Sequence, residues 1–243
     1  FRTSHQDVKF RHLYPEHRIR NFDGEADFRK ALERLPCCVT DQDQTGAGAP
    51  VNLVIVGKPE TLHQLLIRRG WNETERTDNG SSSMENLPFI VAESYRFAPV
   101  SLRYLFGRPQ DAAFRKSRET AGERNHLRLW LAPIKYRGEP VWVGQISREI
   151  KVRYLPNLYR LEPLVDEART YILQDLWYSQ GLAKFGYVKG VGAAPLTEQH
   201  FGLFGDLYAT DGYRAVLWIS DEPTALNEVI DVDWETPGPA RRQ

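Results

Sequence analysis

A pair of strand-like segments between residues 124 and 147 constrains the fold of this chain more than any other feature. From Arg124 to Ile134, polar and apolar residues alternate, which is typical of a strand. The segment 136–140, Tyr-Arg-Gly-Glu-Pro, predicts a turn, and the apolar segment 141–147 follows it directly. Strands joined this closely form an antiparallel hairpin. The hairpin argues against an all-parallel, doubly wound sheet.

The flanking segments add helices and further strands. Residues 51–57 are almost unbroken Val, Leu and Ile, which predicts a strand buried on both faces. Pro59 then opens a helix that Gly70 ends, and Trp71 is expected to pack back onto this pair. Other predicted elements are a short helix at 25–35, a helix from Pro163 to about Gly181, and strands at 185–191 and 214–220. We therefore expect the α+β class, with a mixed or antiparallel sheet, helices packed on it and a single core.

The polarity of the two ends suggests the domain boundaries. Residues 1–34 are rich in Arg and His and are interpreted as a polar N-terminal extension. Residues 35–235 are expected to form the α+β domain, and residues 236–243 a disordered tail. Because the sequence starts at Phe1 rather than Met, we expect that a preceding segment was removed or left out.

Composition excludes several classes of protein. The chain has 32 basic and 32 acidic residues, so it exerts no overall attraction on polyanions, and we expect no nucleic-acid partner. No apolar segment approaches the ~20 residues that span a bilayer. The two cysteines, Cys37 and Cys38, are adjacent and close no useful loop, so disulfides do not hold this fold together.

The polar side of the strand at 124–134 is the first candidate site. Alternation places Arg124, His126, Arg128 and Trp130 on one side and the leucines on the other. Two guanidinium groups flanking an imidazole can bind a phosphate or carboxylate, with His126 as acid or base. The alternative is an amphipathic strand whose polar side meets solvent or a helix, with Arg128 paired to a carboxylate.

A second candidate site is the Gly-Arg-Pro-Gln-Asp segment at 107–111. Such a polar turn can bind a ligand through Arg108 and Gln110. Asp111 is equally well placed to cap a helix at 112–116. This cap leaves Arg108 and Gln110 unexplained, so a structural hydrogen-bond network and a ligand site both remain open for them.

The acidic residues Glu162, Asp166 and Glu167 raise the question of a carboxylate pair or a metal site. Acidic residues are favoured in the first turn of any helix, and Asp166 can pair with Arg169 three residues later. We therefore expect no metal and no cofactor, and keep Asp166 only as a possible catalytic partner of His126. The sequence also lacks the nucleophile elbow, the Walker loop and the zinc-protease motif.

Several blocks of the sequence resemble the LssY C-terminal domain family. In chain order they are Pro50–Gly57, Gly70–Trp71, Pro99–Ser101, Leu105–Asp111, Arg124–Trp130, Val141–Gly144, Glu162–Arg169 and Thr210–Leu217. The resemblance covers about Leu35 to Trp234, and its specificity comes from the order and spacing of the blocks. One block departs from the family: Tyr159 stands where a histidine is expected, so a site built from two histidines is in doubt.

The resemblance implies a bacterial, membrane-associated setting but no particular reaction. We expect a binding or accessory module of an envelope protein, with this segment as its soluble domain. Its partners would be a membrane protein or an anionic ligand. The alternative is a hydrolase or transferase that uses His126 and Arg128 on a phosphate-bearing or lipid-linked substrate, and Tyr159 favours binding over this. A purely structural interaction domain is a third possibility, for which an exposed apolar patch would be evidence.

Overall fold

The computed structural model describes residues 13–74, 100–117, 123–151, 159–203 and 205–237, with only the backbone at 151, 159 and 160. The helical elements are η1 (Glu16–Arg18), α2 (Glu25–Glu33), α3 (Pro59–Arg68) and α5 (Val165–Tyr178). The strands are β1 (Arg20–Phe22), β2 (Cys38–Thr40), β3 (Ala47–Pro50), β4 (Leu53–Val56), β5 (Asn72–Glu73), β6 (Tyr104–Leu105), β7 (Arg108–Pro109), β8 (Ala112–Ser117), β9 (Glu123–Tyr136), β10 (Glu139–Lys151), β11 (Tyr159–Leu161), β12 (Leu182–Lys189), β13 (His200–Phe201), β14 (Leu207–Tyr208), β15 (Tyr213–Ile219) and β16 (Ile230–Asp231).

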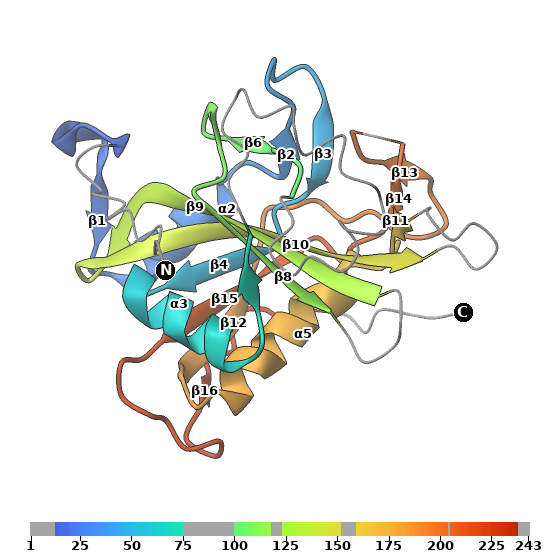
Figure 1. Ribbon diagram of the computed structural model, residues 1–243. Coiled ribbons are helices and arrows are strands. Elements are labelled where there is room, and N and C mark those ends of the chain that lie inside the picture. The colour runs from blue at the N-terminus through green and yellow to red at the C-terminus, as the bar shows by residue number, and fades with distance from the viewer. Residues whose placement is uncertain (1–12, 75–99, 118–122, 152–158, 204, 238–243) are drawn as a thin grey trace.

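Most of these strands form one mixed sheet (Figure 1). Its order is β16-β12-β15-β4-β10-β9-β8-β5, with β1 pairing β9 and β11 pairing β10. The antiparallel hairpin β9–β10 lies near its centre and confirms the strongest prediction from the sequence. β4 pairs in parallel with β15 and antiparallel with β10, so the sheet is mixed, as predicted. Two smaller sheets, β3-β2-β6-β7 and β13-β14, lie beside the large one.

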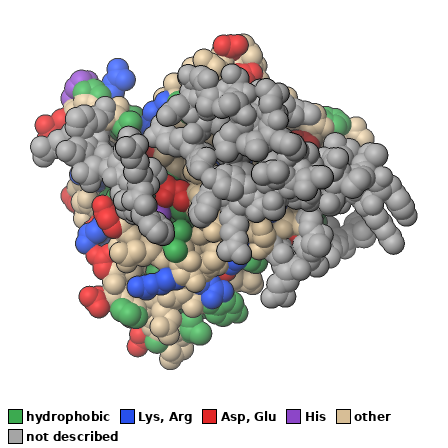
Figure 2. Space-filling view, in the orientation of Figure 1, with side chains coloured by type: hydrophobic (Ala, Val, Ile, Leu, Met, Phe, Trp, Pro, Cys, Tyr) green, Lys and Arg blue, Asp and Glu red, His purple; other side chains and the backbone are tan. Residues whose placement is uncertain are grey.

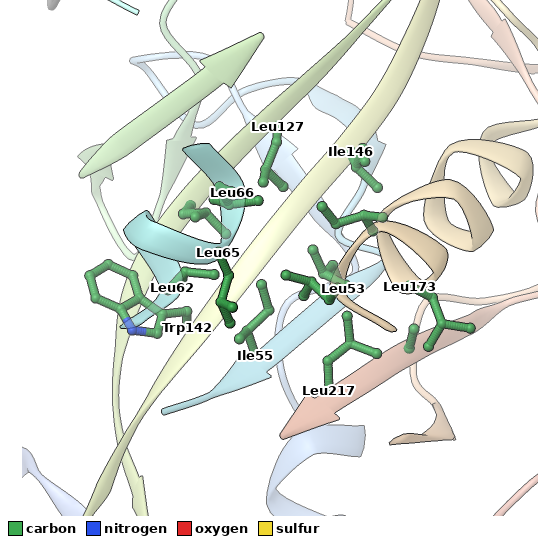
Figure 3. Packing of buried hydrophobic residues seen from close by; sticks show 14 of the residues in the cluster. Leu53, Ile55, Leu62, Leu65, Leu66, Leu127, Trp142, Ile146, Leu173 and Leu217 are labelled. Atoms are coloured by element: carbon green, nitrogen blue, oxygen red, sulfur yellow. The ribbon is translucent and has the colours of Figure 1, made fainter. Parts of the chain in front are cut away.

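One face of the large sheet is covered by α3 and α5. Leu62, Leu65 and Leu66 of α3 and the apolar stripe of α5 pack against Leu127 and Leu129 of β9 (Figure 3). Fully burying a Leu or Ile side chain contributes roughly 1.5–3 kcal/mol, so this layer is a major source of stability. Trp71 is fully buried in the same cluster, as the sequence indicates.

The opposite face carries a second apolar cluster around α2. Phe28 of α2 stacks on Tyr136 of β9 with 4.3 Å between ring centroids. Leu32 of α2 belongs to the same cluster, together with the fully buried Trp130. Buried apolar side chains therefore form two layers, one on each face of the sheet, where the sequence led us to expect one core. Residues 20–33, which fall within the predicted N-terminal extension, supply β1 and α2.

Arg214 of β15 fixes α2 to the sheet. Its side chain is fully buried, and it donates hydrogen bonds to the carbonyls of Leu32, Leu35, Pro36, Val51 and Gly190 at 2.7–3.1 Å. Leu32, Leu35 and Pro36 lie at and just after the end of α2, where backbone carbonyls lack helical partners. Burial lowers the pKa of Arg214 to about 10, so the guanidinium stays charged at neutral pH.

Gly190 is required by this arrangement. Its φ of +125° is a backbone conformation that only glycine adopts readily. A Cβ atom at this position would lie 2.4 Å from the carbonyl oxygen of Glu33 and 2.5 Å from the guanidinium of Arg214. The glycine-rich segment after β12 thus serves the packing of α2.

Two predicted helical features are wrong. Residues 112–117 form the strand β8, paired with β9, rather than a helix that Asp111 caps. The pairing continues back to Asp111, whose backbone N–H donates to the carbonyl of Leu129 at 2.9 Å. α5 begins at Val165 after Leu164, so Pro163 is not its first residue. Cys37 and Cys38 are joined by a disulfide, and the predicted tail at 238–243 lies outside the described residues.

Candidate functional site

A group of buried polar side chains occupies the α2-side face of the sheet where β8, β9 and β10 run together. The strand register places these residues in adjacent rows on one face, because residues directly opposite each other share a face. We call this group the arginine face: Arg115 of β8, Arg124, His126 and Arg128 of β9, and Gln145, Ser147 and Glu149 of β10. The same face continues into Trp130 and the apolar cluster around α2.

His126 and Glu149 form the centre of one row. Nε2 of His126 lies 3.0 Å from a carboxylate oxygen of Glu149, which is an ion-pair distance without hydrogen-bond geometry. Arg124 donates to the same oxygen at 2.7 Å. Burial alone would raise the pKa of Glu149, but His126 and Arg124 hold it at about 2. Glu149 is therefore ionised at any pH at which the protein works.

His126 itself is almost fully buried, with 6% of its surface exposed. Burial lowers the pKa of its imidazole, Glu149 opposes this, and Arg128 and Arg124 lower the pKa further. The ring is consequently neutral near pH 7. Within the described residues, neither ring nitrogen makes a hydrogen bond.

Arg128 is buried and is bound only by uncharged groups. It donates to the carbonyl and the hydroxyl of Ser101, both at 3.2 Å, and to the amide oxygen of Gln145 at 2.8 Å. Burial lowers the pKa of Arg128 to about 9, and the nearby Arg103 acts in the same direction. The guanidinium remains protonated at neutral pH, so a full positive charge is held here without a carboxylate in contact.

Arg115 lies directly across from His126 in the β8–β9 register. Only 8% of its surface is exposed, and its Nε has no hydrogen-bond partner. Across the described part of the chain, no carboxylate lies within ion-pair distance of it. Buried arginine is normally paired, because an uncompensated buried charge is strongly unfavourable.

The charges of the arginine face do not cancel. Arg124 and Glu149 neutralise each other, which leaves Arg115 and Arg128 as two buried cations with His126 beside them. Such a group can bind an anion by charge-assisted hydrogen bonds, because guanidinium donors match the oxygens of phosphates and carboxylates. The interpretation of this strand side as a solvent-facing surface is wrong, since His126 and Arg128 are both buried.

Arg108 and Asp111 belong to a separate, fully partnered network. Arg108 binds Asp111, donates to the hydroxyl of Tyr14 at 3.0 Å and donates to the carbonyl of Leu131 at 2.6 Å. Asp111 also accepts the backbone N–H of Leu131 at 2.7 Å. These contacts tie the β7–β8 segment to β9, so the structure gives Arg108 a structural role.

Gln110 links the two networks. Its amide oxygen accepts the backbone N–H of Arg103 at 2.8 Å, and its amide nitrogen donates to the carbonyl of Ser101 at 3.4 Å. Ser101 is the residue that contacts Arg128, so Gln110 holds the segment 101–103 against the arginine face. Trp130, predicted as a ligand-binding residue, is fully buried in the apolar cluster and donates to the carbonyl of Arg108 at 3.3 Å.

Asp166 is not brought to His126. It lies at the start of α5, which packs on the other face of the sheet. Its carboxylate accepts from the Thr210 hydroxyl at 2.9 Å and from the backbone N–H of Asp211 at 2.7 Å, and Asp211 in turn accepts from Arg169. Burial raises the pKa of Asp166 despite the neighbouring Arg169. These contacts hold the turn before β15 and leave no role in a shared site with His126.

Several residues of the arginine face were missed from the sequence. Arg115 lies in the segment predicted as a helix, and Glu149 lies two residues beyond the predicted end of its strand. Alternation continued past residue 147 would have placed Gln145, Ser147 and Glu149 on one side. Only the backbone of Tyr159 is described, so its expected relation to His126 falls outside the described side chains.

The surface and the metal-binding residue types add two observations. On the described surface visible in Figure 2, acidic and basic side chains are interspersed rather than gathered by sign. Among the described residues, no three His, Cys, Asp or Glu side chains come together as metal ligands would. None of the described helices combines the length and apolarity that a membrane crossing requires.

Comparison with known proteins identifies the family. The family described as LssY C-terminus matches residues 29–213, well over half of the chain. The chain therefore belongs to the LssY C-terminal domain family. Searches of curated proteins and of solved structures found no match.

Proposed function

We propose that this domain is a binding module that holds an anionic ligand at the arginine face, as the accessory domain of a bacterial envelope protein. One observation carries the ligand: Arg115 and Arg128 are buried cations without a carboxylate partner in the described residues. Burying such charges lowers stability unless an anion compensates them. The neutral oxygens of Ser101 that contact Arg128 are the groups an anionic oxygen would replace.

The test is thermal unfolding in a panel of sodium salts. Sulfate, phosphate, acetate and nitrate are compared at constant ionic strength, with chloride as the reference. A ligand at ten times its Kd stabilises the native state by about 1.4 kcal/mol, which raises Tm by roughly 3–5 °C in a chain of this size. We expect at least one salt to do this for the wild type and not for the double variant Arg115→Met/Arg128→Met.

The double variant also controls for general salt effects. Sulfate and phosphate stabilise most proteins by exclusion from their surfaces, and this part remains in both proteins. Arg68→Gln, at an exposed arginine on α3, is the matched control and should respond as the wild type does. Equal shifts in the wild type and the double variant for every salt would exclude the arginine face as an anion site.

The membrane-associated setting rests on family membership and needs its own test. When the protein is expressed from its native gene, we expect it to sediment with the membrane fraction and to be released by detergent. Recovery in the supernatant without detergent would remove the envelope part of the proposal and leave the anion site intact.

A second function, hydrolysis or group transfer on a phosphate-bearing or lipid-linked substrate, has one observation in its favour. His126 lies 3.0 Å from the ionised Glu149, as a histidine oriented by a carboxylate does in general acid–base sites. A screen of phosphomonoesters and phosphodiesters, with and without divalent metals, would test it with His126→Ala beside the wild type. Activity that disappears in the variant supports catalysis, and equal activity in both removes His126 from any mechanism.

A further inference from the structure

The arrangement of donors on the arginine face narrows the ligand beyond an anion in general. Arg115 and His126 are directly opposite neighbours on β8 and β9, which places their Cβ atoms about 4.5–5.5 Å apart. Arg128 is two residues along β9 from His126, a distance of roughly 7 Å along the strand. The diagonal between Arg115 and Arg128 is about 7–8 Å. Three donor groups therefore stand around one small area of the sheet.

The charge at this point is set by residues from each surrounding element. Arg124 from β9 and Glu149 from β10 cancel each other, and Ser147 and Gln145 on β10 are neutral. Arg103, from the segment before β6, adds a positive charge that Asp206 partly offsets. His126 is neutral at pH 7. The two guanidiniums of Arg115 and Arg128 are therefore the charges that a ligand has to balance.

We propose, building on the anion-binding function above, that the ligand group is a tetrahedral dianion of the phosphate-monoester type, held between Arg115 and Arg128 with His126 beside it. Two buried positive charges are balanced by a group that carries two negative charges, and a carboxylate or nitrate supplies only one. A tetrahedral group also offers three or more acceptor oxygens in different directions, which suits donors that approach from two strands. Planar monoanions present their oxygens in one plane.

Isothermal titration calorimetry at constant ionic strength tests the charge of the ligand. Sulfate, phosphoserine, nitrate and acetate are the probes, and titrations are run at pH 7.5 and pH 5.0. At pH 7.5 we expect sulfate and phosphoserine to bind at least tenfold more tightly than nitrate and acetate. Arg115→Met and Arg128→Met should each weaken sulfate binding by tenfold or more, and Arg68→Gln should leave it unchanged.

The pH comparison separates the charge of the ligand from that of the protein. The phosphate of phosphoserine has a second pKa near 6, so it is mostly a dianion at pH 7.5 and mostly a monoanion at pH 5.0. Sulfate remains a dianion at both values and reports any change in His126. We therefore expect the ratio of phosphoserine affinity to sulfate affinity to fall several-fold from pH 7.5 to pH 5.0.

The outcomes distinguish this inference from the proposed function. Nitrate or acetate binding as tightly as sulfate, with both losing affinity in Arg115→Met and Arg128→Met, would overturn the dianion and leave the anion site standing. A constant ratio across pH would overturn it as well. Sulfate binding that neither variant changes would place the anion elsewhere and overturn both. Circular dichroism of each variant confirms that it is folded.

Discussion

Arg214 and Arg115 are both buried arginines on strands of the same sheet, and their surroundings are opposite. Arg214 donates to five backbone carbonyls that would otherwise lack partners near the end of α2. Arg115 has a buried Nε without a partner and no carboxylate within ion-pair distance in the described residues. Burial alone therefore does not distinguish a structural arginine from a functional one. The inventory of partners does, because the first satisfies other buried groups and the second is itself unsatisfied.

The sharpest test of this comparison is Arg214→Met. The substitution removes a charged donor and leaves buried carbonyls of Leu32, Leu35 and Val51 without their hydrogen bonds. We expect a loss of about 4 kcal/mol in the free energy of unfolding, measured by urea denaturation. Arg34→Gln, at an exposed arginine in the same region, should change stability by less than about 0.5 kcal/mol. A small loss for Arg214→Met would mean that α2 is held by its apolar contacts alone.

Arg108 provides an intermediate case, because its partners include a carboxylate. Arg108→Met leaves Asp111 with one backbone donor and removes bonds to Tyr14 and the carbonyl of Leu131. We expect a loss of about 2–3 kcal/mol in the same denaturation experiment. Anion binding should persist, since Arg108 is not on the arginine face. Loss of anion binding in a folded Arg108→Met protein would contradict the division into two networks.

The arginine face should also give the protein a specific sensitivity to acid. Glu149 has a native-state pKa of about 2, against 4.5 for the free side chain. A depressed acidic pKa contributes stability that is fully present above 4.5 and is lost as the pH falls toward 2. We expect Glu149→Gln to lower stability by roughly 2 kcal/mol at pH 7, with the difference from wild type vanishing by about pH 2. Denaturation curves between pH 2 and pH 7 would show this, and a difference that does not depend on pH would refute it.

The smallest expected effect has the opposite sign. Arg115→Met replaces an uncompensated buried charge with an apolar side chain of similar length, so we expect a gain of about 1 kcal/mol in the absence of ligand. The same variant should lose anion binding. Urea denaturation in chloride buffer gives the stability. A loss comparable to that of Arg214→Met would show that Arg115 has a structural role and would remove the contrast between the two arginines.

Much of the large sheet could be predicted from the sequence because its signals are local. Alternation in residues 124–134 defines β9 and its two faces, and the turn at 136–140 defines the hairpin. The same alternation correctly placed Arg124, His126 and Arg128 together. The segment 112–116 was predicted incorrectly because Asp111 followed by Ala, Lys and Arg is also typical of a capped helix. Pairing with β9 overrides that local preference.

The partners of the site residues could not be predicted because they depend on register and on distant segments. Glu149 meets His126 only because β9 and β10 pair with one particular register. Asp166 is held by Thr210 and Asp211, more than forty residues later, through contacts that no local pattern announces. The carboxylate that sequence reasoning assigned to His126 is thus used elsewhere, and the one that lies beside it is Glu149.

The contacts of Arg214 have a consequence for the order in which the chain acquires its structure. Its acceptors at Leu32 and Val51 lie 182 and 163 residues earlier in the sequence. On a ribosome, α2 is made near the beginning, yet the guanidinium that anchors it emerges only after most of the chain has been translated. The first helix to be synthesised in this part of the domain is therefore among the last to be secured, and nascent chains shorter than about 214 residues must keep that segment soluble by other means.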